Sequence, residues 1–254
     1  MDLTTWEDDE ADPLEDEFED FDLLLFTKLE DTRDQINKML KKACPEEVDN
    51  CFEQIMKLAS DMQDCLEKNE IWRLDDVLAC FGDGVKRPLA SGNAEEYYQR
   101  RKAYFKCLDE MEHLRSSWAR EVKEASAYLY KDGVESYKKY RDSFLEVYGT
   151  GKSHYAEWQI FKKNLFWFFI YTYFCGAVYD DWIVTKAGMA IFAVECVEEL
   201  VMYHFLADNS DMSGEDWISL SGALAREVEH SDDNLNLLEE WLWQRWESRE
   251  RAKT

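Results

Sequence analysis

The chain has 254 residues, of which 55 are acidic and 30 are basic, so its formal net charge at pH 7 is −25. This charge argues against a nucleic-acid-binding protein, because neutralising phosphates requires clustered Lys and Arg. Only three prolines and ten glycines are present, too few to punctuate an all-β fold. Ten tryptophans indicate a well-filled interior. The composition therefore predicts an all-α fold, a multi-helix bundle.

The first 20 residues hold eleven acidic residues and no basic one. Such a run repels itself, so it predicts a disordered acidic tail over residues 1–20. Residues 21–251 are expected to form a single all-helical domain, since the sequence contains no internal repeat and no long linker.

Three helices are expected in the N-terminal half. Apolar residues follow helical spacing from about Phe18 to Lys42, beginning with Phe18 and Phe21, and again from Val48 to Leu66. Pro45 lies between these segments and suits the first turn of the second helix. A short helix is predicted over Trp72–Phe81. The segment Gly82–Asn93 is the clearest loop.

The C-terminal half is expected to contain six more helices. A break is predicted at Asp132–Gly133, and Ser213 is the predicted N-cap of a helix, with Asp216 three residues later. The expected helices cover Ala94–Tyr130, Val134–Tyr148, His154–Val178, Trp182–Leu206, the segment from Ser213 to His230, and Asn234–Arg251.

The longest apolar run is Leu165–Tyr179, which is rich in aromatic residues. Its fifteen residues fall short of the roughly 20 needed to span a bilayer. A helix that is apolar all round is typical of a protein core. The run therefore predicts a largely buried aromatic central helix and no membrane span.

Seven cysteines are scattered along the chain without a CxxC pair, so a zinc or iron–sulfur site built from cysteine is not expected. Met1 leads directly into acidic sequence with no signal peptide. These features predict reduced thiols and a cytoplasmic location.

Two Glu-x-x-His tetrads occur, Glu110–His113 and Glu227–His230. Residues three apart on a helix share a face, so each tetrad could bring two side chains to one ion. With a carboxylate from Glu195, Glu198 or Glu199, the two tetrads would resemble a di-iron carboxylate site. Glutamate is common in this chain, so chance also accounts for both tetrads, and the metal site remains an alternative.

Glu227, Glu229, His230 and Asn234 cluster around a predicted break between the last two helices. Capping provides a structural explanation, because a histidine suits the C-terminus of one helix and acidic residues suit the first turn of the helix that follows. Asp180 and Asp181 follow the aromatic run. Paired carboxylates can serve as an acid and a base, or they can mark the point where a buried helix reaches water.

The segment Arg226–Leu235 resembles the closing motif of bacterial flagellin lysine-N-methylases. In the same order, Phe161–Phe174 resembles the aromatic helix of that family, and Ala177–Asp181 and Lys186–Ala193 follow as in the family. The region Phe18–Leu78 is weakly similar to the middle helices of the family. The likeness therefore covers most of the chain, but it matches only the C-terminal part of the family pattern. The family's cysteine-rich N-terminal part, expected to hold an iron–sulfur cluster, has no counterpart here.

The resemblance implies methyl transfer from S-adenosylmethionine to lysine side chains of a protein such as flagellin. An acidic, aromatic-lined surface would attract a cationic lysine, and a base would take its proton. The expected catalytic residues are Glu227, Glu229 and His230. The expected substrate-binding residues are Tyr179, Asp180, Asp181 and Asn234. No iron–sulfur cluster is expected in this chain, so a separate cysteine-rich chain is a possible partner.

Independent enzymatic activity is left open by the sequence. The chain could be a lysine methylase, or the helical half of one that binds substrate and acts as a scaffold. It could instead be a non-catalytic helical protein whose acidic surface binds a basic partner, or an acidic surface that serves solubility alone.

Overall fold

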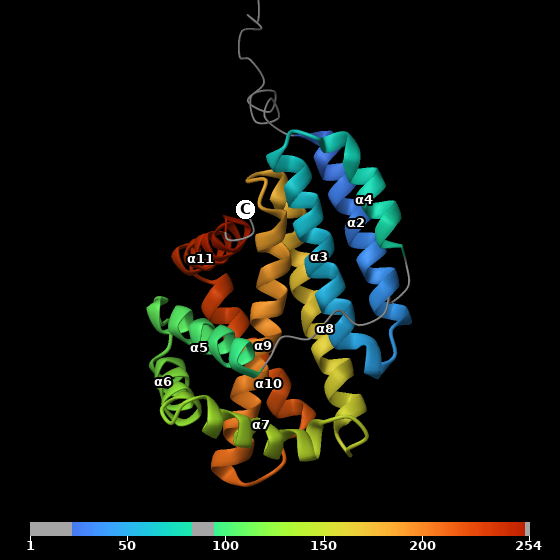
Figure 1. Cartoon of the computed structure of the whole chain (residues 1–254). Coiled ribbons are helices and arrows are strands. Elements are labelled where there is room, and N and C mark those ends of the chain that lie inside the picture. The colour runs from blue at the N-terminus through green and yellow to red at the C-terminus, as the bar shows by residue number, and fades with distance from the viewer. Residues whose placement is uncertain (1–21, 83–93, 252–254) are drawn as a thin grey trace, which may run out of the picture.

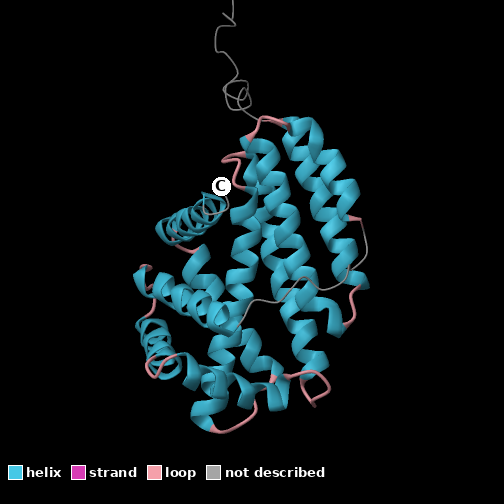
Figure 2. Ribbon diagram, viewed as in Figure 1, coloured by secondary structure: helices cyan, strands magenta, loops and turns pink. Residues whose placement is uncertain are grey.

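The computed structural model describes residues 22–82 and 94–251, and within these ranges every regular element is a helix (Figures 1 and 2). The predicted all-α fold is confirmed. The α-helices are α2 (Leu23–Lys42), α3 (Val48–Glu67), α4 (Leu74–Phe81), α5 (Ala94–Glu110), α6 (Ser116–Tyr130), α7 (Val134–Tyr148), α8 (Tyr155–Tyr173), α9 (Ile183–Asp208), α10 (Gly214–Glu229) and α11 (Asp232–Arg251). The short 3-10 helices are η1 (Pro45–Glu47), η2 (Ile71–Arg73) and η3 (Phe174–Val178).

Some predicted features fall outside the described residues. These are the acidic tail over residues 1–20, most of the loop Gly82–Asn93, and Phe18 and Phe21. The described part of the first helix begins at Leu23, where the Asp22 carboxylate accepts a hydrogen bond from the Leu25 N–H at 2.9 Å. The division into a tail and one domain over 21–251 stays a prediction.

Helix α9 lies at the centre of the bundle (Figure 1). Its sequence is mostly apolar or small, and every residue from Ile183 to Met202 except Ile191 is buried, including four charged ones, Lys186, Glu195, Glu198 and Glu199. Helices α3, α5, α6, α7, α8, α10 and α11 all pack against it. Gly188 faces α11, and a Cβ at this position would make an ordinary van der Waals contact with the Leu242 side chain at 3.5 Å.

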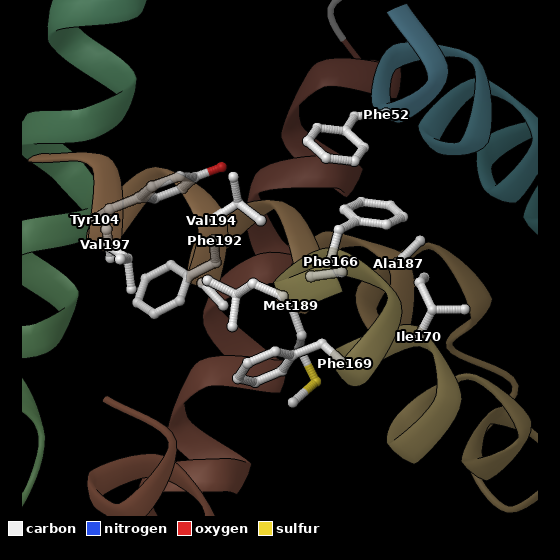
Figure 3. Packing of buried hydrophobic residues seen from close by; sticks show 14 of the residues in the cluster. Phe52, Tyr104, Phe166, Phe169, Ile170, Ala187, Met189, Phe192, Val194 and Val197 are labelled. Atoms are coloured by element: carbon white, nitrogen blue, oxygen red, sulfur yellow. The ribbon is translucent and has the colours of Figure 1, made fainter. Parts of the chain in front are cut away.

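The aromatic helix expected over His154–Val178 is α8, which continues as η3. One face of it is buried, and there Phe166 stacks on Phe52 of α3 with ring centroids 4.3 Å apart (Figure 3). Phe168 and Tyr171 are exposed. The aromatic helix is thus buried along the face that packs on α9 and α3, and the helix enclosed on most sides is α9.

The long helix predicted over Ala94–Tyr130 is wrong, because the chain forms two helices, α5 and α6, with an irregular segment at residues 111–115 between them. This segment contains no Pro or Gly that would announce the break. Its backbone is held by side chains from the other end of the chain: the Glu112 N–H donates to Asn234, and the Leu114 N–H donates to Glu227. Tertiary contacts therefore replace the helical hydrogen bonds here.

Several other helix ends lie where the sequence placed them. Helix α7 spans Val134–Tyr148 as predicted. Ser213 caps α10 by accepting a hydrogen bond from the Asp216 N–H, and this helix ends at Glu229. Helix α11 begins at Asp232, two residues before the predicted start. None of the helices in the described ranges has the length and apolar character needed to cross a bilayer.

Candidate functional site

Glu227 lies at the last turn of α10 and is only 1% exposed. Its Oε1 accepts a hydrogen bond from Arg115 Nε at 2.9 Å, and its Oε2 accepts one from the Leu114 N–H at 2.8 Å. Arg115 also donates to the carbonyl of Ala223 at 3.1 Å. Both oxygens of the carboxylate are therefore engaged within the protein. This geometry joins α10 to the segment between α5 and α6.

Asn234, in the first turn of α11, fastens the same segment from the other side. Its Oδ1 accepts a hydrogen bond from the Glu112 N–H at 2.7 Å. Its Nδ2 donates to the carbonyls of Glu112 at 2.8 Å and Glu227 at 2.7 Å. The buried side chain thus ties together three parts of the chain, the α10 end, the α11 start and the 111–115 segment.

The side chains of Glu229 and His230 make none of the hydrogen bonds of this buried clamp. Glu229 is half-buried beside Tyr173, and burial, followed by the charge of Glu229, raises the pKa of the Tyr173 hydroxyl. His230 is the exposed C-cap of α10, as the capping explanation predicted, and its N–H donates to the carbonyl of Arg226 at 3.3 Å. Of the three expected catalytic side chains, His230 is thus exposed, whereas Glu229 is half-buried and its Oε1 is buried without a hydrogen-bond partner among the described residues.

The predicted substrate-binding residues after η3 differ in their surroundings. Tyr179 is 82% exposed, and Asp181 is also exposed, with its backbone in the left-handed region at φ 61°. Asp180 instead accepts a hydrogen bond from Lys186 Nζ at 2.6 Å. Lys186, 5% exposed, also bonds Glu239 of α11. An internal lysine therefore already neutralises Asp180.

The metal alternative rests on Glu110, His113, Glu227 and His230. Its geometric premise fails for the first tetrad, because α5 ends at Glu110 and His113 lies in the irregular segment. Glu110 pairs with Lys106 at 3.4 Å, and Glu227 is held by Arg115. Within residues 22–82 and 94–251, no three His, Cys, Asp or Glu side chains gather as metal ligands would.

A charged cavity, which the sequence did not predict, opens between α3, α5, α9 and α11, with contributions from α7 and α8. Its volume is about 420 Å³, within the range of roughly 300–1,000 Å³ typical of ligand sites. Apolar side chains such as Met56, Leu242 and Trp246 share its lining with six Arg or Lys side chains and four carboxylates. Phe52, Tyr104 and Val194, three further lining residues, belong to the buried cluster drawn in Figure 3.

The floor of this cavity is a network of buried charges. Arg101 is 3% exposed and donates to Glu198 at 3.1 Å and to Glu199 at 2.7 Å. Arg141 and Lys162 also face Glu198, at 3.0 Å and 3.8 Å. Burial opposes ionisation of Glu198, but these three cations hold the pKa of its carboxyl well below its usual range. Such networks are costly to bury and often mark functional sites.

Two of the glutamates considered as metal ligands are held by other tyrosine and arginine side chains. Glu199 accepts hydrogen bonds from the Tyr130 and Tyr137 hydroxyls at 2.7 and 2.6 Å. Glu195 forms a two-point ion pair with Arg100, with N–O distances of 2.8 and 2.5 Å. The adjacent pair of arginines and the three glutamates were visible in the sequence, but no local pattern indicates that they meet.

The family model of the FliB lysine N-methylase C-terminal domain matches residues 52–253 of this chain. The chain belongs to this family. The resemblance inferred from the sequence is therefore confirmed. Searches of curated proteins and of solved structures gave no match.

The FliB C-terminal domain match begins in α3 and runs through α11, so it includes the α10–α11 bend and every residue that lines the charged cavity except Asp49. The seven cysteines of the chain are all free thiols. The four buried ones, Cys51, Cys65, Cys107 and Cys196, pack as small apolar side chains.

Proposed function

We propose that this chain takes part in the N-methylation of protein lysines and provides a helical substrate-binding and scaffold half. The observation that carries the proposal is the family match, which covers most of the chain. Flagellin is the proposed substrate, and the cytoplasm is the proposed location. An iron–sulfur cluster, where the reaction needs one, would belong to a separate cysteine-rich chain.

The α10–α11 bend is the proposed docking surface for the lysine-bearing protein. Asp232 and Asp233 are exposed in the first turn of α11, and Asp181 and Tyr179 are exposed after η3. The two groups lie on connected parts of the fold, because Lys186 joins the segment after η3 to α11 through its ion pairs. Exposed carboxylates on a protein of net charge −25 favour the approach of a basic partner.

Different roles follow for the expected catalytic residues. Glu229 and His230 are the proposed proton acceptors, because a lysine must lose its proton before its nitrogen can be methylated. Glu227 is proposed as a positioning residue, since both its oxygens are held by the 111–115 segment and Arg115. Asn234 has the same role. S-adenosylmethionine would supply the methyl group.

The test combines purified protein, flagellin and S-adenosylmethionine, with and without a cysteine-rich partner chain. Mass spectrometry would measure lysine methylation, and interferometry would measure flagellin binding. We expect flagellin binding in both mixtures and methylation in at least one of them. Absence of both in both mixtures would reject the proposal, and binding without methylation would favour a non-catalytic interaction protein.

A charge-matched pair of variants tests the docking surface. Asp232→Asn with Asp233→Asn should weaken flagellin binding several-fold, because two exposed carboxylates at the bend are removed. Glu124→Gln with Asp142→Asn makes the same change of net charge on the exposed surfaces of α6 and α7 and should leave binding nearly unchanged. Equal losses in both variants would mean that overall charge, not this surface, attracts flagellin.

A further inference from the structure

We propose that the cavity between α3, α5, α9 and α11 binds a small molecule with an α-amino-acid group, whose carboxylate meets Arg245 and whose ammonium meets Glu53. The choice of S-adenosylmethionine as the ligand rests on the proposed function. The inference adds where this molecule would bind and which side chains would recognise it.

Most charged groups of the cavity already have partners inside it. Arg100 pairs with Glu195, and Arg101 pairs with Glu198 and Glu199. Lys162 pairs with Asp49 at 2.5 Å. These ion pairs neutralise the buried charged side chains at the floor of the cavity, so few of them are available to pair with a charged ligand.

Arg245 is different, because its guanidinium has no carboxylate partner among the residues that the structure describes. The group lies over the ring of Trp241, 4.5 Å from the ring centroid, and lines the cavity from α11. Its charged neighbours, Arg249 and Arg100, are also cations. Burial, with their repulsion, lowers the pKa of Arg245. A bound anion would relieve this unfavourable environment.

Glu53 presents the opposite charge from α3. It is half-buried in the cavity lining and forms no ion pair within the described ranges. Burial, and then the charge of Asp49, raises the pKa of its carboxyl. A bound ammonium would favour the ionised form of Glu53, as a guanidinium does for Asp or Glu elsewhere.

Arg245 and the more exposed Arg249 are the lining cations without a carboxylate partner in the described ranges, and Glu53 is the lining carboxylate without a cation partner. Because the unpaired groups have both signs, a zwitterion matches them better than a simple anion or cation does. A lone phosphate would leave Glu53 unpaired, and a substrate lysine would meet the guanidinium of Arg245. The apolar lining from Met56, Leu242 and Trp246 can receive the uncharged remainder of the molecule. Trp246 is held in place by a hydrogen bond from its Nε1 to Ser60 at 3.3 Å.

The experiment measures binding by calorimetry, without any requirement for methylation. S-adenosylhomocysteine carries both the amino-acid group and the ring system, methionine carries the amino-acid group without the ring, and methylthioadenosine carries the ring without the amino-acid group. We expect S-adenosylhomocysteine to bind most tightly, with methylthioadenosine at least 10-fold weaker. Equal affinity for these two compounds, or no binding of any of the three, would overturn the proposal.

Arg245→Met and Glu53→Gln should each weaken S-adenosylhomocysteine binding about 10- to 100-fold, the usual effect of losing a hydrogen bond to a charged group. Arg120→Met and Glu124→Gln, exposed positions on α6, are the matched controls and should bind like the parent. The ligand-free cavity variants should melt no lower than the parent, because each removes an unpaired charge. Lower melting temperatures with unchanged binding would show a structural role instead.

The outcomes separate this inference from the proposed function. Methylation of flagellin without binding of S-adenosylhomocysteine to this chain would reject the cavity and keep the function. Binding that depends on Arg245 and Glu53, with no methylation or flagellin binding in any mixture, would keep the cavity and reject the function.

Discussion

Glu227 illustrates how the surroundings of one carboxylate determine its chemistry. A general base must be able to reach a substrate proton, but both oxygens of this side chain already accept hydrogen bonds from Arg115 and the Leu114 N–H. Asn234 reinforces the same contact through two carbonyls and one N–H. At the level of residues, the motif around the bend contains a buried clamp and, next to it in the sequence, half-buried Glu229 and exposed His230.

Glu227→Gln tests the clamp directly. We expect a loss of about 1–3 kcal/mol in the free energy of unfolding, because a charged acceptor is replaced by a neutral amide and Arg115, partly exposed, regains only some solvation. Urea denaturation would measure the change. Glu240→Gln, at an exposed position on α11, is the control and should change stability by less than about 0.5 kcal/mol. Unchanged stability of Glu227→Gln, with lost methylation, would instead support a catalytic role.

At the level of helices, the effect of a glycine on stability depends on the backbone conformation of its position. Gly222 lies within α10, and a Cβ built there meets no atom within 4 Å. Gly133 precedes α7 with φ 79° and ψ −177°, a region of backbone conformation that is essentially limited to glycine. The first glycine costs helix stability, whereas the second permits the turn that starts α7.

The same substitution should therefore have opposite effects at the two sites. Gly222→Ala should raise the free energy of unfolding by about 0.5–1 kcal/mol through helix propensity. Gly133→Ala should lower it by about 1–3 kcal/mol through backbone strain. Urea denaturation of both variants checks the pair, and a stabilised Gly133→Ala would show that the turn tolerates another conformation.

Local residues such as Gly133 also explain which helix ends could be predicted from the sequence. Gly133 and Gly149 bracket α7, and Ser213 with Asp216 caps α10, so local chemistry fixes these boundaries. The break between α5 and α6 has no such marker, because Glu227 and Asn234, more than 100 residues later, supply its partners. A local pattern contains no information about contacts at that separation.

The candidate site likewise contains features that a local sequence pattern predicts and features that only tertiary contacts determine. The sequence motif located the bend and its exposed acidic residues, but it could not separate buried Glu227 from accessible His230. The cavity was missed because Arg101 and Glu198 meet only when α5 packs on α9. The two helices are 97 positions apart at this contact, so the pairing depends on the tertiary fold alone.

At the scale of the whole molecule, charge is distributed unevenly between interior and surface. Arg101, Lys162 and Lys186 are all buried in ion pairs with carboxylates. Glu195, Glu198, Glu199 and Glu227 are buried as well, so the buried charges nearly cancel and almost all of the net charge of −25 lies outside the interior. Repulsion among the surface carboxylates then opposes the compact state, as it does in other proteins far from neutrality.

Salt should therefore stabilise this protein. Sodium chloride screens exposed charges over a Debye length of about 10 Å at 0.1 M, and it screens buried pairs much less. We expect the melting temperature to rise by about 2–4 °C between 20 mM and 500 mM sodium chloride, equivalent to roughly 1 kcal/mol for a chain of this size. Scanning calorimetry would measure the shift. Potassium chloride is the control, because two chlorides that screen equally should act alike, whereas sulfate also strengthens apolar burial.

A melting temperature that falls with salt would contradict this account. It would mean that exposed ion pairs such as Lys57–Asp61, 2.8 Å apart, stabilise the folded protein by more than the repulsion among surface carboxylates destabilises it. The acidic surface would then be locally neutralised rather than strained. Its long-range attraction for a basic partner would be correspondingly weak, since the same unpaired carboxylates must produce both effects.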